Sequence, residues 1–522
     1  MSTPKEQDFS LYQPLDYDGL VLMSEYFDAG GPGQNSLTAS FYDLESNSFE
    51  KRILSRLYKD LDKISERTSY AILNKYEESL RPFIKIIRKL KERGLVKDVF
   101  IDHRRFNDSP AFSRIDITPS IDDTYNTDGR KIVRTFGHSS GQDLISMVSK
   151  SIGEFLERYY LTKYSRKNFV TNSYVDLNRR ARALDPKKLV SFSEEQQNQS
   201  NRFAWTPEHR LHWVQGVRVS TGQKTMLPAQ LIFWNYISGD IPEVFLREPN
   251  TNGSGGMFNR EGAMLAGLYE LIERDAFLIF WLNRISPPQI DISSLNKDLR
   301  SSILQVQRCR FKCHILNTTL DIGPPSFVAI ILDESWVGPY LSMGGGCHAN
   351  PEIAATKAYE EAWGVYYSLR SKKDSHPVYE LADNYRPFGD PSLGQEERLH
   401  LWANPKMREH IAFFLEGHAQ DIQKVRFDFP RSFATTRDEL NFLVKRVESL
   451  GIGYEVYGFE VRDYFLNHEL GYNVTQVVVP ELVPLYLNET FAPLGASRLR
   501  TVLPKLGYQI KRKFNTFPHP FP

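Results

Sequence analysis

Residues 152–158 read IGEFLER, and residues 268–274 read LYELIER. Both stretches place two apolar residues between two glutamates, add an arginine, and lie inside longer apolar runs. In an α-helix, residues i and i+3 lie on the same side. Glu154 and Glu157 are therefore expected to point the same way, and so are Glu270 and Glu273. The repeat predicts two helices that each present a pair of carboxylates.

The simplest interpretation of each motif is an ion pair between residues i and i+4, Glu154–Arg158 and Glu270–Arg274, which contributes ~0.2–0.5 kcal/mol. Its occurrence twice in apolar helices favours a shared site, because carboxylates seldom lie near a core without a partner. Four convergent carboxylates suit Mg²⁺, which usually keeps substrate phosphates as further ligands. The sequence contains no G-x-x-x-x-G-K-[ST] motif. We therefore expect the four glutamates to bind an Mg²⁺–nucleotide without a P-loop.

A glycine-rich segment precedes each acidic stretch. Residues 136–141 read FGHSSG and residues 251–256 read TNGSGG. Backbone N–H groups that are exposed in a turn before a helix attract anions. We expect both segments to be turns that cradle phosphate, and we include Ser140 among the candidate nucleotide-binding residues.

Two other kinds of site compete with this interpretation. Residues 137–141 match the nucleophile elbow G-x-S-x-G, which would make Ser139 the nucleophile of an α/β-hydrolase. The βαβ repetition of that fold is missing, so the hydrolase is a remote alternative. Cys309, Cys313 and Cys347 could join neighbouring histidines in a zinc site, but the spacing is not that of a standard zinc knuckle. Buried free thiols are the expected outcome.

Composition excludes several classes of protein. The 522 residues include 65 basic and 64 acidic side chains and 41% hydrophobic residues, which excludes wholesale disorder and gives no case for nucleic-acid or membrane partners. Three cysteines exclude a disulfide scaffold. The first ten residues lack a basic and an apolar signal region, and the longest apolar run, Ala276 to Leu282, is far shorter than a membrane span. A cytoplasmic protein is expected.

The chain is expected to have two parts and an α+β fold. Residues 1–110 begin with a polar arm and continue as helices with apolar stripes at 53–64 and 83–90, followed by Gly94 and a strand at 95–101. We assign this part to partner binding. Residues 115–522 are expected to form one large domain of mixed sheets flanked by helices. Its helices are predicted at 149–160, 261–282, 353–369 and 437–450, and its strands at 212–220, 224–234, 454–461 and 474–480.

The two E-x-x-E-R stretches, the N-G-x-x-G turn and the final FPHPFP (residues 517–522) resemble the YcaO family. More narrowly, they resemble the cyclodehydratase subunit of azoline-forming peptide-modification systems. Further agreement occurs at residues 183–186 (ALDP) and 344–351 (GGGCHANP). The resemblance spans residues 115–522 and implies the YcaO fold.

This resemblance implies that the chain binds ATP and Mg²⁺ through Glu154, Glu157, Glu270 and Glu273, with Arg158 and Arg274 orienting those carboxylates or meeting phosphate. It implies phosphorylation of a backbone amide in a ribosomal precursor peptide, and ring closure by a Cys, Ser or Thr side chain. The implied partners are a leader-binding protein, a flavin dehydrogenase that oxidises the rings, and a second copy in a homodimer. Thioamidation is another activity of this family.

The proline-rich end is expected to be extended, because Pro518, Pro520 and Pro522 fix φ and lack N–H groups. On sequence alone it would be a solvated end, whereas the resemblance implies a catalytic tail that delivers its terminal carboxylate to the ATP site.

Four positions depart from the family pattern, and they keep a second hypothesis open, a non-catalytic scaffold that docks the precursor or a partner enzyme. These positions are Lys150, Gly262, Gly364 and Gln476.

Overall fold

The computed structural model describes residues 13–15, 79–103, 110, 113–120, 137–141, 143–189, 191–239, 241–335, 338–371, 385–389 and 393–522. The chain forms two compact units. The first runs to Phe155 without residues 108–110 and 125–133, and the second contains these two segments and Leu156–Pro522. Both helices and sheets occur, as the predicted α+β class requires. The sequence-based boundary between residues 110 and 115 stays a prediction.

The first unit contains an antiparallel sheet with the strand order β1-β2-β3-β4. A helix at residues 79–92 precedes the sheet and buries one apolar stripe that includes Phe83 and Leu90. It ends at Gly94, whose φ of +67° fits the predicted helix stop. The predicted stripe at 53–64 and almost all of the predicted arm lie outside the described residues. The strands are β1 (Gln13–Leu15), β2 (Val96–His103), β3 (Ser113–Pro119) and β4 (Gly137–Gly141).

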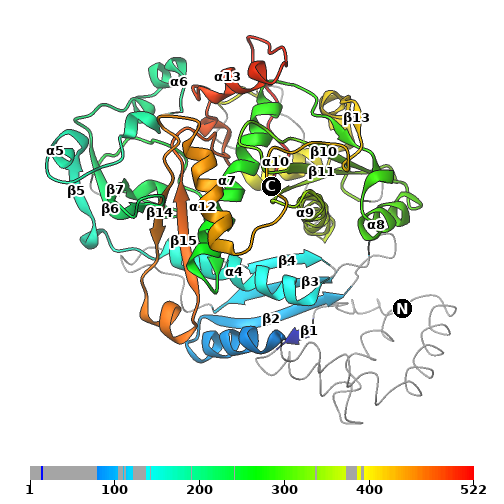
Figure 1. The fold of residues 1–522 in the computed structure, drawn as a ribbon, viewed down its shortest axis with the longest axis horizontal. Coiled ribbons are helices and arrows are strands. Elements are labelled where there is room, and N and C mark those ends of the chain that lie inside the picture. Colours follow the sequence, from blue (N-terminus) through cyan, green and yellow to red (C-terminus); the bar gives the residue numbers. More distant parts are fainter. Residues whose placement is uncertain are drawn as a thin grey trace, which may run out of the picture. The chain divides into compact units, whose positions relative to one another are not determined.

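The second unit contains two sheets (Figure 1). The first has the order β5-β6-β14-β15-β8, with β7 paired to β6. These strands are β5 (Val170–Ser173), β6 (Arg210–Arg218), β7 (Lys224–Pro228), β8 (Ser254–Met257), β14 (Tyr457–Glu460) and β15 (Asn473–Val478). Strands β6 and β7 pair as a hairpin, and Gly222 in the turn between them has a φ of +69°.

The second sheet of this unit has the order β12-β11-β10-β9-β13 and is antiparallel except between β13 and β9. Strands β11 and β12 are buried along their whole length. The strands are β9 (Gln289–Ile290), β10 (Phe311–Asn317), β11 (Ser326–Asp333), β12 (Leu341–Cys347) and β13 (Ala419–Gln420).

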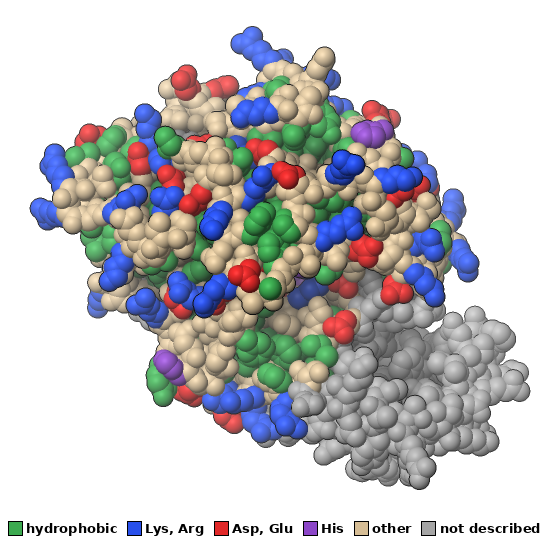
Figure 2. Space-filling view, viewed as in Figure 1, with side chains coloured by type: hydrophobic (Ala, Val, Ile, Leu, Met, Phe, Trp, Pro, Cys, Tyr) green, Lys and Arg blue, Asp and Glu red, His purple; other side chains and the backbone are tan. Residues whose placement is uncertain are grey.

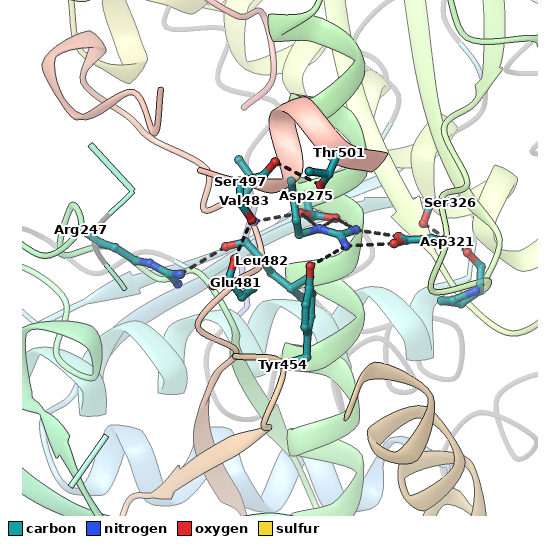
Figure 3. A network of polar contacts seen from close by, with 12 residues as sticks. Arg247, Asp275, Asp321, Ser326, Tyr454, Glu481, Leu482, Val483, Ser497 and Thr501 are labelled. Atoms are coloured by element: carbon teal, nitrogen blue, oxygen red, sulfur yellow. Dashed lines mark hydrogen bonds and ion pairs between the residues drawn. The ribbon is translucent and has the colours of Figure 1, made fainter. Parts of the chain in front are cut away.

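Helix α7 (Arg260–Leu282) contacts both sheets, because it touches β8 and β15 on one side and β11 and β12 on the other. Its residues are buried almost all round from Ala263 to Leu282, as expected for a helix with few polar residues. The second E-x-x-E-R motif therefore lies on the central helix of the unit (Figure 1). Directly after this motif, Asp275 forms a buried ion pair with Arg498 (Figure 3).

The other long helices also lie where the sequence predicts them. They are α4 (Leu144–Thr162), which passes from the first unit into the second, α9 (Pro351–Ser371) and α12 (Thr436–Glu448). The shorter helices are α5 (Tyr174–Asn178), α6 (Glu194–Gln199), α8 (Lys297–Gln307), α10 (Gln395–Trp402), α11 (Arg408–Ala412) and α13 (Arg498–Lys505).

The surface agrees with the balanced composition. On the face drawn in Figure 2, acidic and basic side chains are interspersed. None of the helices in the described part of the chain is long and apolar enough to cross a membrane.

Candidate functional site

Glu270 of α7 lies against the turn that leads into β8. The Gly253 N–H donates to Glu270 Oε2 at 2.7 Å, and Arg274 Nη2 lies 2.7 Å from Glu270 Oε1. Arg274 also donates to Asn252 Oδ1 at 2.5 Å. Gly253 has a φ of +87°, and a Cβ there would lie 2.4 Å from Val477 O, so this position requires glycine. The N-G-x-x-G turn thus holds the first carboxylate of α7, and the predicted Glu270–Arg274 ion pair is confirmed.

Glu157 reaches the same strand from α4. Its Oε2 accepts a 2.8 Å hydrogen bond from Ser254 Oγ, and a Cβ on Gly256 would lie 3.0 Å from its Oε1. The neighbouring Arg158 places its guanidinium 5.6 Å from the centre of the Trp234 ring. The small residues of β8 therefore leave room for the Glu157 carboxylate beside the turn.

Glu154 belongs to the first unit. Its Oε2 accepts a hydrogen bond from the His138 N–H at 2.6 Å and lies 3.1 Å from His138 Nδ1. The convergence of Glu154 with the other three predicted glutamates stays a prediction.

Glu273 faces a carboxylate that the sequence analysis did not assign to the site. The Gly345 N–H donates to Glu361 Oε2 at 2.6 Å, and a Cβ on Gly345 would lie 2.5 Å from Glu273 Oε1. Burial raises the pKa of the Glu273 carboxyl well above its usual range, and the charge of Glu361 raises it further, while Arg274 and Lys357 oppose the shift. A cation bound between Glu273 and Glu361 would relieve this electrostatic cost.

The proline-rich tail ends at the same glycine. Phe521 is 1% exposed, its ring stacks on Phe277 at 4.7 Å between centroids, and its Cζ would lie 2.6 Å from a Cβ on Gly345. The tail carbonyls accept hydrogen bonds from buried donors, including Trp402 Nε1 to Pro518 O at 2.9 Å. Prolines lack N–H groups, so their burial leaves fewer backbone donors to satisfy. The expectation of a solvated end is wrong, while the delivery of the terminal carboxylate to an ATP site stays a prediction.

His519 and Arg398 hold this tail through hydrogen bonds to backbone carbonyls. His519 Nε2 donates to Tyr486 O at 2.8 Å, and Arg398 Nη1 donates to the same oxygen at 2.9 Å. Burial lowers the pKa of His519 well below its ordinary value, so the imidazole is neutral. Arg398 Nη2 also lies 3.4 Å from Phe521 O. Burial raises the pKa of the nearby Glu489 to about 7.

The side chains of the second unit suit Mg²⁺ only together with the phosphates of a nucleotide. In the described ranges no three His, Cys, Asp or Glu side chains are grouped closely enough to hold a metal by themselves. Binding of an Mg²⁺–nucleotide by the four predicted glutamates stays a prediction. A carboxylate pair that shares an ion with phosphate oxygens does fit. Arg274 Nε and Gln476 Oε1 are buried without a hydrogen-bond partner in the described part of the chain, so polar ligand atoms could satisfy them.

The structure contradicts the predictions for residues 137–141, while residue 136 lies outside the described residues. Residues Gly137–Gly141 form strand β4 rather than a phosphate-binding turn, and Ser140 is buried in it. The Ser139 hydroxyl donates to Met147 O at 2.7 Å and lies 2.9 Å from Ser151 Oγ. A hydroxyl in the middle of a strand is not a nucleophile elbow, so the hydrolase interpretation is wrong. Glycine is needed there for another reason, because a Cβ on Gly137 would lie 2.1 Å from Ser151 O.

The cysteines are free thiols. Cys313 and Cys347 are buried, as predicted, and Cys309 is partly exposed.

A signal for Glu361 is present in the sequence. Strand β12 approaches α9 so closely that a Cβ on Gly344 would lie 2.3 Å from the Ala362 N, and one on Gly346 would lie 2.1 Å from Ala354 O. Three consecutive glycines before a helix with alanines at 354, 358 and 362 therefore indicate strand-on-helix packing. Glu361 lies on that helix, which brings it to the strand.

Known proteins resemble this chain in sequence and in fold. A family model described as YcaO cyclodehydratase, ATP- and Mg²⁺-binding, matches residues 146–483. An uncharacterised protein of Methanothermobacter thermautotrophicus is 31% identical over 155 residues, which are 29% of this chain and 40% of that protein. This chain thus spans less than half of that relative's length.

Solved structures share the fold. A heterocyclase in complex with substrate and cofactor superposes with a TM-score of 0.63 at 19% identity, over 84% of this chain and 57% of that one. YcaO from Methanopyrus kandleri, bound with AMPPCP and Mg²⁺, gives a TM-score of 0.53 at 19% identity, over 78% of this chain and 90% of that one.

Proposed function

The chain belongs to the YcaO family, and from this membership we propose that it is the ATP-dependent cyclodehydratase subunit of an azoline-forming system. Its substrate would be a ribosomal precursor peptide in which Cys, Ser or Thr becomes a thiazoline or oxazoline. The observation that carries the proposal is the meeting of Glu273, Glu361 and Phe521 at Gly345.

The proposed reaction balances without an oxidant. The side-chain thiol or hydroxyl adds to the preceding amide carbon and loses its proton. The γ-phosphoryl group of ATP passes to the amide oxygen, which leaves as phosphate, and the amide nitrogen loses its proton as the C=N bond forms. The products are the azoline, ADP and phosphate. Phosphorylation makes a poor leaving group into a good one.

The side chains of this chain would divide the work. Glu273 and Glu361 would hold Mg²⁺, which offsets phosphate charge when bound, and Glu154, Glu157 and Glu270 would complete the acidic surroundings. Arg274, which Asn252 and Glu270 hold, would meet a phosphate oxygen. Arg158 stays a candidate nucleotide-binding residue from the resemblance, whereas Ser140, which is buried in β4, is not proposed again.

The tail would close the site to water. Its burial among Phe277, Trp281 and Trp402 supports a fixed position for Pro518, Pro520 and Pro522. Exclusion of water protects the phosphorylated intermediate from hydrolysis.

We also propose that the chain works in the cytoplasm with other proteins. A leader-binding protein would deliver the precursor, residues 1–110 would contact such a partner, and a flavin dehydrogenase would oxidise the rings. The resemblance motivates each of these partners.

Peptide-dependent phosphate release tests the function. With precursor, partner protein, ATP and Mg²⁺ present, Glu273→Gln should reduce release at least ~100-fold, since an amide cannot supply the carboxylate charge. Glu208→Gln, at an exposed position, is the matched control and should behave as wild type. Wild-type release from Glu273→Gln would refute the assignment. Absence of ATP binding to the wild type in calorimetry with saturating Mg²⁺ and partner would favour the scaffold alternative.

A further inference from the structure

A groove lies beside the middle of β6 and shares no lining residue with the carboxylate site. It has a volume of about 460 Å³, and a second cavity of about 380 Å³ adjoins it. Both are lined by Gln215, Phe459 and Arg462.

The backbone of Gln215 faces this groove. In the hairpin, the Arg218 N–H donates to Gln223 O. From this pair along β6, hydrogen-bonded residue pairs alternate with pairs that exchange no hydrogen bond. Gln215 and Met226 lie opposite each other in a pair of the second kind. The hydrogen bonds of Met226 support this assignment. Its N–H donates to Arg182 O and its C=O accepts from the Leu184 N–H, both on the side away from β6. The N–H and C=O of Gln215 therefore point to the edge of β6 opposite β7.

That edge is open at residues 214–216. Strand β5 pairs with β6 only as far as Val170–Trp213, and β14 pairs with it only at Tyr457–Arg218 and Gly458–Val217. Within the described strands, neither neighbour pairs with Gln215. At ~3.3 Å per residue, the gap from Trp213 to Val217 spans about 13 Å, enough for three or four residues of an added strand.

The side chains around the gap indicate what the added strand would carry. The groove is lined by aromatic rings that suit an apolar side chain. Its basic residues outnumber its acidic ones, because Lys163, Arg260 and Arg462 line the two cavities with only Glu460, which pairs with Arg260 at 3.4 Å. The aromatic lining consists of Tyr160, Tyr164, Phe169, Trp213, Phe233 and Phe459.

We propose that residues 214–216 of β6 are a docking edge for an extended acidic segment of the substrate peptide, which adds as a strand between β5 and β14. Only an extended polypeptide presents both an N–H and a C=O at the spacing of a strand edge, and the basic rim selects acidic neighbours. The identity of this peptide as the substrate rests on the proposed function.

Proline and alanine at position 215 separate backbone recognition from side-chain recognition. Gln215→Pro removes the edge N–H but no bond to β7, so the sheet should fold. Gln215→Ala, the matched control, keeps the N–H. The probe is a fluorescein-labelled peptide, Gly-Thr-Phe-Asp-Val-Asp-Cys-Gly, measured by anisotropy at low salt. We expect Gln215→Pro to weaken binding about tenfold or more, and Gln215→Ala about twofold or less. Arg462→Ala should weaken binding about threefold, an effect that salt removes.

A second measurement tests the inference on the wild type alone, so that it holds even if the proline variant misfolds. Probes that are N-methylated at one set of alternate residues or at the other should differ, because only one set faces β6. The inference would be overturned if the wild type did not bind the peptide, or if ATP displaced the peptide competitively. It would also be overturned if the proline and alanine variants bound equally and the two N-methylated probes bound equally. Mg²⁺–ATP binding is measured in parallel. Its absence would count against the proposed function alone, and its retention beside a failed peptide test would count against the docking edge alone.

Discussion

Arg498 ties helix α7 to the C-terminal part of the chain, and its removal should be costly. The side chain is 0% exposed, and Asp275 of α7 is 1% exposed. Nε and Nη2 of Arg498 donate to Asp275 at 2.9 and 2.7 Å, and Nη1 and Nη2 donate to Asp321 at 3.1 and 2.8 Å (Figure 3). The two carboxylates hold the pKa of Arg498 well above its ordinary value, so it stays charged.

The expected loss in the free energy of unfolding depends on which charged groups each substitution leaves buried. Arg498→Met keeps much of the side-chain volume but leaves Asp275 buried with the Val483 N–H and without its ion-pair partner, which costs ~3–5 kcal/mol. Asp321→Asn should cost only ~1 kcal/mol, because Asp321 is 22% exposed and Arg498 keeps Asp275. The double variant Arg498→Met/Asp275→Asn should be less destabilised than Arg498→Met, because it removes the uncompensated charge.

Urea unfolding at pH 7.5, followed by tryptophan fluorescence, measures these differences in the free energy of unfolding. Trp281 reports on the relevant region, since it is buried in α7 itself. A loss below ~1 kcal/mol for Arg498→Met, or a double variant as unstable as the sum of its single changes, would refute the reasoning.

Three further outcomes follow from the described contacts. A folded-state pKa raised in Glu273 means that ligand-free protein loses stability as pH rises through that pKa. Glu273→Gln should therefore be ~1 kcal/mol more stable than wild type at pH 8.5 and lose this advantage below pH ~4.3, the unfolded value, in urea titrations. Gly345→Ala puts a methyl group 2.5 Å from Glu273 Oε1 and should weaken Mg²⁺–ATP binding about tenfold in calorimetry, whereas unchanged affinity would exclude Gly345 from the site. Burial raises the pKa of Cys313 to about 12, so iodoacetamide at pH 8 should label Cys309 at least ~100-fold faster by peptide mass mapping, and equal rates would contradict the burial.

The sequence predicted long helices better than it predicted glycine-rich strands. Periodicity located α4, α7, α9 and α12, because each buries a defined stripe or is apolar all round. It misassigned residues 137–141, because glycine and serine are typical of turns and carry no alternation of apolar side chains. The close approach of α4, which forbids a Cβ at Gly137, is a tertiary constraint that no local pattern contains.

The site was predicted in part for a similar reason. The i, i+3 spacing correctly identified Glu270 and Glu273 as carboxylates of one helix, but their partners come from elsewhere in the chain. Glu361 follows Glu273 by more than 80 residues in the sequence, and only the packing of α9 on β12 brings the two carboxylates together. Proline spacing predicted an extended tail, whereas its burial depends on its contacts with Phe277, Trp281 and Trp402.

The buried ion pair and the acidic site share one turn of α7, and this suggests why a costly charge pair lies in the core. Glu273 and Asp275 are two residues apart, so their side chains leave the helix about 200° apart. One faces Gly345 and Glu361, and the other faces Arg498. A rotation of α7 by one residue would turn both carboxylates away from their partners. A leucine at position 275 could tolerate such a rotation, because apolar contacts are not directional. Arg498 and Asp275 therefore fix the rotation of the helix that carries Glu273, in addition to any net stability that they contribute.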